Sequence, residues 1–341
     1  MLLSITFYNY VLIKYEYDFR KLFDIYLKGI IFCCWVGVFQ FLSHKVGFGP
    51  GYNYTWIFNK WGLHLGSLFG LRINSIFSEP SQFALVLLPA VFVASHHILM
   101  RDFTLLSLRK CILIYVALIM TTSSTGYIGI FVSLILIGIN LGRIFDLIVV
   151  LLLSVVGAAV LYSWVPDFKS RIDSSINLWT IDNYTIEDIN TSSFVLFNNS
   201  HVAWENISEH PLTGSGLGSF PLAYEKYSLT KEEDFLIKKG FDFNAQDGNS
   251  LFLRSMAEMG IIGVLFWFVI IGRFFVRKNR EDPEDISWLY SSAFLAIIFG
   301  YLLRQGNYFL NGFPFFVLAY VALHQKFKEG KGVKEEEVVE E

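Results

Sequence analysis

Apolar runs of membrane-spanning length recur along most of the chain. They lie at about 29–44, 82–98, 111–124, 126–142, 146–164, 257–276, 288–303 and 308–324. A helix needs roughly 20 apolar residues to cross the hydrocarbon core of a bilayer, and a helix satisfies its own backbone hydrogen bonds there. The pattern therefore predicts an all-α fold, a polytopic transmembrane helix bundle of about eight spans.

A long polar segment interrupts this pattern and divides the bundle into two parts. We expect an N-terminal apolar and cytoplasmic segment, a first bundle part, a large helical loop, a second bundle part and an acidic tail. Their boundaries are 1–28, 29–164, 165–256, 257–324 and 325–341. The first 13 residues are apolar but too short to span, which is typical of an interfacial helix or the remnant of a span.

Basic residues cluster in the segments that one side of such a bundle would carry. They lie at 14–28, 101–110, 143, 277–280 and 326–334. The positive-inside rule assigns segments rich in Lys and Arg to the cytoplasm. The loops at 45–81 and 165–256 and the short turn near Arg304 then face outward, and the C-terminus lies inside. One orientation thus accommodates every basic cluster.

Composition supports a membrane protein and excludes several other classes. Of 341 residues, 54% are hydrophobic and 17% are charged, whereas soluble domains carry about 25% charged residues. The loop at 165–256 holds no cysteine, which excludes a disulfide framework or a cysteine zinc site there. Between 165 and 255 it has 13 acidic and seven basic residues, so it is no nucleic-acid surface. No phosphate-loop or HExxH motif occurs.

The first candidate site stretch precedes the span at 82–98. It reads Arg72-Ile-Asn-Ser-Ile-Phe-Ser78-Glu79-Pro80-Ser81-Gln82. Pro80 suits the first turn of a helix and Ser78 its cap, which would make this a helix start. Alternatively, ionisable groups at membrane depth usually line a cavity, which would make Arg72 and Glu79 functional. The polar break at 121–126 lies on the same side and favours a tight turn.

The large loop carries the second set of candidates. Arg171 follows the span at 146–164, and His201 and Trp204 lie on a short helix predicted at 198–210. That helix should end before Pro211. His210 then opens the run His-Pro-Leu-Thr-Gly-Ser-Gly-Leu-Gly-Ser-Phe at 210–220, whose glycines allow close backbone approach. Either histidine can also be an ordinary loop residue.

The third set lies where the chain re-enters the membrane and at the last outer turn. Asn249 is expected to cap the re-entry helix, on which Arg254 and Glu258 stand one turn apart. That spacing is typical of a simple ion pair, although an outward-facing arginine beside a polar cap can also hold a phosphate. The turn at 304–308, with Arg304 and Tyr308, places an isolated arginine outside, against the charge rule.

Together these stretches resemble the bacterial O-antigen polymerase and O-antigen ligase superfamily. The resemblance rests on the stretch at 72–84, the run at 210–220, the re-entry at 249–263 and, for the polymerase branch, the turn at 304–308. It covers about residues 29–324. Each motif is weak alone, and the resemblance rests on the order of the motifs along the chain and on their common position on the outer side of the membrane.

The resemblance implies a glycosyltransferase of the inner (plasma) membrane with a large periplasmic loop and no metal or cofactor. Its donor and acceptor are oligosaccharides linked to undecaprenyl diphosphate, and its partners are the lipid bilayer and, in the same pathway, flippase and chain-length regulator proteins. It places Arg72, Glu79, Arg171, Arg254, Arg304 and His210 in catalysis. It places Ser81, Gln82, His201, Trp204, Asn249 and Tyr308 in substrate binding, and among base candidates it ranks Glu79 before Asp247 and the two histidines.

Two departures from the superfamily pattern affect which branch is favoured. The loop exit reads Asp247-Gly248-Asn249, where ligases commonly have a histidine before the asparagine. The segment before the His-Pro run lacks an arginine that members often carry, so His201 or Arg171 would have to replace it. The first departure favours a polymerase over a ligase, and a flippase of lipid-linked sugars is the alternative from another class.

Overall fold

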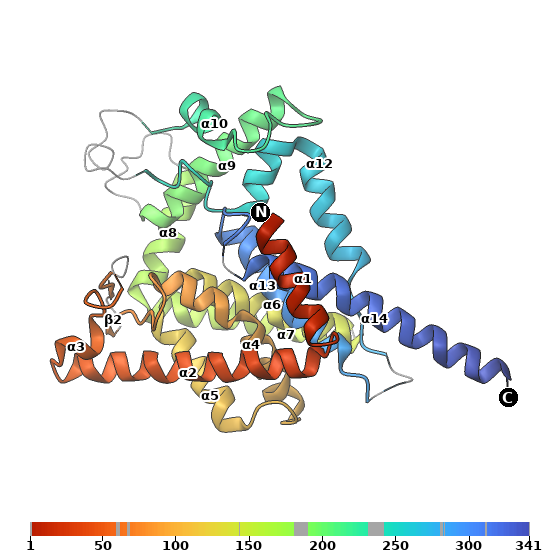
Figure 1. Ribbon diagram of the computed structural model, residues 1–341. Coiled ribbons are helices and arrows are strands. Elements are labelled where there is room, and N and C mark those ends of the chain that lie inside the picture. Colours follow the sequence, from red (N-terminus) through yellow and green to blue (C-terminus); the bar gives the residue numbers. More distant parts are fainter. Residues whose placement is uncertain are drawn as a thin grey trace. The chain divides into compact units, whose positions relative to one another are not determined.

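The computed structural model describes residues 2–58, 62–66, 69–142, 144–180, 190–230, 242–279, 282, 284–310 and 312–340. The chain divides into two compact units. Unit 1 consists of Met1–Val155, Phe274–Gly300 and Asn311–Glu341, and unit 2 consists of Val156–Arg273 and Tyr301–Leu310. Figure 1 labels the helices of both and the strand β2.

Nearly all regular structure in the described residues is helical. Unit 1 holds α1 (Leu2–Lys14), α2 (Phe19–Lys45), α3 (Gly49–Tyr52), β1 (Leu65–Gly66), β2 (Gly70–Leu71), α4 (Pro80–Met100), α5 (Leu108–Met120), α6 (Ser124–Leu141), the start of α7 (Ile144–Trp164), most of α13 (Ser287–Arg304) and α14 (Phe313–Glu340). Unit 2 holds the rest of α7, α8 (Pro166–Thr180), α9 (Thr191–Glu209), α10 (Phe220–Tyr227), α12 (Leu251–Arg273) and the turn after α13.

The predicted all-α membrane bundle is confirmed. Among the described residues, five helices are long and apolar enough to cross a bilayer: α2, α4, α6, α12 and α13. The other predicted spans coincide with α5, α7 and α14, and the N-terminal apolar segment forms α1. The repeated apolar runs thus predicted the positions of the helices. A segment inside a bilayer must satisfy its own backbone hydrogen bonds, and a helix does so.

The core of unit 1 surrounds α4, which packs against α5 and α6. Its side chains Phe83, Leu87 and Phe92 are fully buried. Leu88 faces Gly129 of α6 and Gly300 of α13, where any Cβ would collide with it. Small residues let helices approach closely in a bilayer, where the hydrophobic effect between helices is weak.

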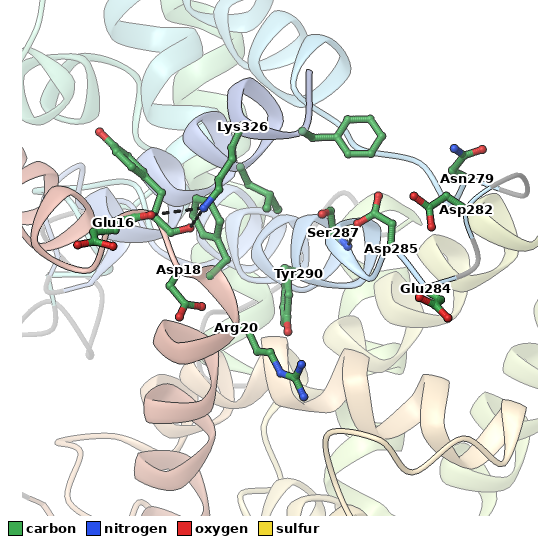
Figure 2. A pocket seen from close by; sticks show the side chains of 14 residues that line it. Glu16, Asp18, Arg20, Asn279, Asp282, Glu284, Asp285, Ser287, Tyr290 and Lys326 are labelled. Atoms are coloured by element: carbon green, nitrogen blue, oxygen red, sulfur yellow. Dashed lines mark hydrogen bonds between the residues drawn. The ribbon is translucent and has the colours of Figure 1, made fainter. Parts of the chain in front are cut away.

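Three segments that the charge rule assigns to the same side meet around an open pocket of about 1070 Å³ in unit 1. They are the turn between α1 and α2, the chain before α13, and the middle of α14 (Figure 2). Lys326 of α14 donates to the carbonyl of Tyr17 at 3.1 Å and so secures the turn between α1 and α2. Arg143 and Arg280, which belong to the same charge pattern, lie outside the described residues.

The core of unit 2 forms where α9 packs against α8, α10 and α12. Phe194, Val202, Phe220 and Ala257 are fully buried in it. The predicted end of α9 before Pro211 is confirmed, but the predicted start at 198 is wrong. The helix begins at Thr191, because the Asn190 side chain accepts from the amide of Ser192 at 3.1 Å and caps it there.

Candidate active site

A break in the re-entry helix α12 organises the centre of unit 2. Gly260 has φ 60° and ψ −147°, a conformation in which the helix cannot continue. The freed amide of Ile261 donates to the carbonyl of Pro211 at 2.9 Å. On the other side of the break, the carbonyl of Glu258 accepts from the amide of Gly216 at 2.9 Å. The loop from Pro211 to Gly216 therefore supplies the partners that the broken helix lacks.

Glycine is needed on both sides of this contact. Gly214 has φ +63°, and a Cβ there would collide with the backbone of Ala257 and Glu258. A Cβ at Gly260 would lie 2.7 Å from the amide nitrogen of Gly214. The glycine run of the loop and the re-entry motif thus form one backbone interlock, which confirms the close backbone approach predicted for the run.

Glu258, next to the break, is the polar centre of the site. Its side chain is fully buried. Oε1 accepts from Arg254 Nε at 2.9 Å and from the amide of Phe220 at 3.3 Å, and Oε2 accepts from the hydroxyl of Tyr308 at 3.0 Å. A single carboxylate thus connects α12, the start of α10 and the turn after α13.

Arg254 is held on three sides. Besides the bond from Nε to Glu258, Nη1 donates to the carbonyl of Gly306 at 3.1 Å. Its guanidinium carbon lies 4.8 Å from the centre of the Tyr308 ring, a cation–π contact. The side chain is 17% exposed. Among the described residues no partner occupies its other three N–H groups, so one edge of the fork is available to an anion.

Tyr308 takes part as a donor. Burial raises the pKa of its hydroxyl well above the usual value, and the negative charge of Glu258 raises it further. The phenol therefore stays protonated throughout the physiological range and donates a hydrogen bond to Glu258. The predicted residues Arg254 and Tyr308, which lie far apart in the sequence, meet here on the same carboxylate.

The loop exit packs against the same turn. Gly306 lies so close to the backbone of Asp247 that a Cβ would collide with it. Asp247 Oδ1 accepts from the amide of Asn249, whose φ is +53°. The prediction that Asn249 caps α12 is wrong, because the backbone at this residue is left-handed. The hydroxyl of Ser250 accepts from Leu253 N at 3.2 Å and performs the capping instead.

The other predicted residues of unit 2 lie on or next to α8, α9 and α13. Arg304 ends α13 and is half-buried. His201 and Trp204 share an outer face of α9, where His201 lies 4.0 Å from Glu205 and Trp204 is 64% exposed. His210 follows α9 and is exposed. Arg171 lies on α8, but its side chain is outside the described part of the chain.

In unit 1 the structure joins the first candidate stretch to the polar break at 121–126. The amide of Arg72 donates to His64 O at 2.9 Å, next to the short pairing of β1 and β2. Arg72 Nε donates to Thr121 O at 3.2 Å, and the side chain covers Gly66. Part of this guanidinium is thus used to close the turn between α5 and α6.

Glu79 lies directly before α4 and is exposed. It is the residue that precedes the helix, so the prediction that Ser78 caps it is wrong. The hydroxyl of Ser78 donates instead to Gln82 Oε1 at 2.8 Å, and Ser81 donates to Glu79 Oε2 at 2.8 Å. Pro80 stands in the first turn as predicted. The carboxylate keeps lone pairs that other donors can use.

A buried amide holds this stretch in place. Gln40 of α2 is fully buried, and its Oε1 accepts from the amides of Asn74 at 3.1 Å and Ser75 at 3.0 Å. Its Nε2 donates to Asn74 Oδ1 at 2.8 Å. Gln40 thus satisfies backbone groups of an irregular segment that could not be buried otherwise.

Replacing Gln40 with alanine should therefore destabilise unit 1. Two backbone amides would lose their buried acceptor, at a cost of roughly 2–5 kcal/mol in total. We expect the detergent-solubilised variant to have a lower thermal unfolding midpoint. The midpoint is measured by size-exclusion chromatography of samples heated to a series of temperatures. Gln325→Ala, at an exposed position of α14, is the control and should melt like the parent. Equal midpoints for both variants would contradict this role.

Residues 111–268 match the family model described as O-antigen ligase. The match covers less than half of the chain, and in this region the chain is similar to the O-antigen ligase family. Comparison with curated proteins and with solved structures gave no significant match.

The matched region contains most of the cluster around α12. It includes Arg254, Glu258 and both halves of the glycine interlock, while Tyr308 lies beyond its end. Arg72 and Glu79 precede it. The match supports a membrane enzyme of glycosyltransferase type within the ligase and polymerase superfamily, and it does not separate the two branches.

One group of described side chains has the composition of a metal site. A ligand atom from each of His96, His97 and Asp102 lies within 4.8 Å of the others. However, His97 Nε2 accepts from the amide of Leu105 at 3.2 Å, which places the ring proton on Nδ1. A metal at Nδ1 would require the opposite tautomer, so the residues present do not fit a metal well.

The sequence predictions do not include Glu258, Gly260 and Gln40 as residues of the site or its support. The sequence identifies Glu258 only as a partner of Arg254. A signal for all three is present, since each is a polar or glycine residue within an apolar stretch of predicted helix. Such residues usually mark a packing or functional constraint.

Proposed function

We propose that the protein is a polysaccharide polymerase with a lipid-linked donor. It transfers a growing glycan from undecaprenyl diphosphate onto the terminal sugar of a new undecaprenyl-diphosphate-linked repeat unit, in O-antigen or capsule biosynthesis. The family match supports the class of enzyme. The observation that carries the proposal is Arg254, a fixed guanidinium with one free edge beside the membrane re-entry point.

The reaction needs such a group because a diphosphate leaves. The acceptor hydroxyl attacks the anomeric carbon, the bond from that carbon to the diphosphate oxygen breaks, and undecaprenyl diphosphate departs with the bonding electrons. A preorganised arginine stabilises the charge that develops on the departing oxygens. Arg72, Arg171 and Arg304 remain further candidates for this role.

A general base must take the proton of the acceptor hydroxyl. Among the candidates, Asp247 uses one carboxylate oxygen to hold the backbone amide of Asn249 and the side-chain amide of Asn244. Glu79 is exposed and is bonded only to the hydroxyl of Ser81 among the described residues, so it still ranks first. His201 and His210 follow it. Trp204 and Tyr308 are proposed to stack on sugars.

A ligase would use the same donor chemistry but a different acceptor, and a flippase would form no bond. The residues Asp247-Gly248-Asn249 at the loop exit support the assignment as a polymerase. The outer position predicted for the polar clusters supports chemistry at one leaflet rather than alternating access.

Reconstitution tests the proposal directly. Purified protein in liposomes receives one lipid-linked repeat unit as both donor and acceptor, and the glycans are released and separated by size. We expect a ladder of multiples of the repeat unit. A ligase would give a product only after addition of its own acceptor, and a flippase would give none. Absence of a ladder from a protein that elutes as a folded species would contradict polymerase function.

A further inference from the structure

We propose that Glu258 is a positioning residue that fixes the guanidinium of Arg254 and the ring of Tyr308 for departure of the diphosphate. The inference rests on the proposed function, which makes Arg254 the group that binds the diphosphate. It assigns a role to a side chain that contacts neither donor nor acceptor. Both partners depend on the same carboxylate, Arg254 through Oε1 and Tyr308 through Oε2.

The surroundings of Glu258 exclude a direct catalytic role. Its side chain has no exposed surface. A carboxylate offers about four lone-pair sites, and Glu258 uses three of them for Arg254, Phe220 and Tyr308. Because the side chain is also completely buried, an acceptor hydroxyl has no access to it. A buried carboxylate that is fully surrounded in this way orients its neighbours.

The orientation matters because arginine is a long side chain with several rotatable bonds. Binding a diphosphate through two parallel N–H groups requires the plane of the fork to be set in advance. Glu258 sets the Nε side and the carbonyl of Gly306 sets one Nη side. The Tyr308 ring, tethered to the same carboxylate, covers one face of the plane. Only the remaining edge is left for a ligand.

The location of Glu258 links this orientation to the glycine interlock. Its backbone carbonyl accepts from Gly216 at the break, and its side chain accepts from Phe220 at the end of the same loop. The loop that closes the break thus also holds the carboxylate. The two motifs therefore meet at Glu258, one through its backbone carbonyl and the other through its side chain.

A double-mutant cycle separates positioning from simple stabilisation. Glu258→Gln keeps the shape of the side chain but removes its charge. We expect kcat for glycan transfer to fall about 30-fold, since a misplaced catalytic group costs on the order of 100-fold, while KM for the donor changes less than about threefold. In an Arg254→Ala background the same change should have almost no further effect, because Glu258 acts through Arg254. Effects that multiply would overturn the proposal.

Two further variants keep the inference testable if Glu258→Gln folds poorly. Tyr308→Phe removes the hydroxyl, and with it the contact to Oε2 and a hydrogen bond with Ser255. We expect kcat to fall about threefold to tenfold, as for the loss of a hydrogen bond of ordinary net strength. Full activity of Tyr308→Phe would overturn the proposal. Glu225→Gln, at an exposed position of α10, is the control and should behave like the parent.

A spectroscopic readout distinguishes failure of this inference from failure of the proposed function. Fluorotyrosine is incorporated at 308 and its ionisation is followed by ¹⁹F NMR as pH rises. Because the charge of Glu258 raises the pKa of Tyr308, Glu258→Gln should lower it. An unchanged pKa would show that the carboxylate does not hold the tyrosine. A lowered pKa in a protein without transferase activity would leave the contact established and reject the function.

Discussion

Replacing Arg254 with alanine is expected to lower the rate of glycan transfer by about 100- to 1,000-fold, the usual effect of removing one preorganised donor to a developing negative charge. The guanidinium is held by Glu258, Gly306 and Tyr308, so its free edge is fixed before the substrate arrives. The loss should appear mainly in kcat, because the charge on the departing diphosphate grows only as the bond to the sugar breaks.

The measurement is single-turnover transfer in liposomes, with folding checked by size-exclusion chromatography. Arg254→Lys keeps the charge but lacks the fork, and its rate should lie between those of the parent and the alanine variant. Arg273→Ala is the matched control, since this arginine is exposed at the far end of the same helix. An alanine variant at 254 that transfers glycan at the parent rate would refute the assignment of Arg254 to the diphosphate.

The importance of Arg254 could be predicted from the sequence because its key features are local. The four-residue spacing to Glu258 predicts an ion pair on one face of a helix, and the structure contains it. The sequence identifies Tyr308 as a candidate residue but does not predict which residues it contacts. Its contact to Glu258 spans 50 positions and depends on how the turn after α13 folds back. Periodicity describes single helices and contains no information about such contacts.

The two wrong helix caps have a similar cause. Ser78 and Asn249 are good caps by residue type, and each lies one position before the residue that precedes its helix. At α4 the hydroxyl of Ser78 bonds Gln82, and at α12 the left-handed backbone of Asn249 leaves the role to Ser250. Helix boundaries depend on where the incoming chain is held, which tertiary contacts decide.

Gln40 shows the same limit within an apolar run. Its partners are Asn74 and Ser75, whose buried amides it satisfies from 34 and 35 positions away. Nothing near it in the sequence indicates that pairing. The run predicts a helix, and the helix is present. The role of the polar side chain inside it, however, depends on the irregular segment packed against α2.

The break in α12 is the clearest case. An apolar run from 257 to 276 predicts an uninterrupted helix, and a single glycine inside such a run is commonly tolerated for packing. The break at Gly260 is possible only because the loop beginning at Pro211 supplies hydrogen-bond partners. Those residues lie far earlier in the chain, so the sequence predicts the two motifs separately and does not predict the interlock between them.

Replacing Gly260 with alanine is expected to destabilise unit 2 by on the order of 4 kcal/mol, the sum of a backbone conformation confined to glycine and a collision in a packed region. A Cβ would lie 2.7 Å from the nitrogen of Gly214 and the carbonyl oxygen of Pro211. If α12 straightened to avoid them, the loop would lose the partners of Ser215 and Gly216, and Glu258 would rotate away from Phe220. The thermal midpoint in detergent should fall by roughly 10 °C, with transfer activity lost at lower temperatures.

Gly272→Ala is the matched control in the same helix, because no atom lies within 4 Å of its Cβ position. This control variant should leave the stability of the protein unchanged or raise it by up to about 1 kcal/mol. If Gly260→Ala and Gly272→Ala both melt at the parent temperature, the break at Gly260 does not hold the loop.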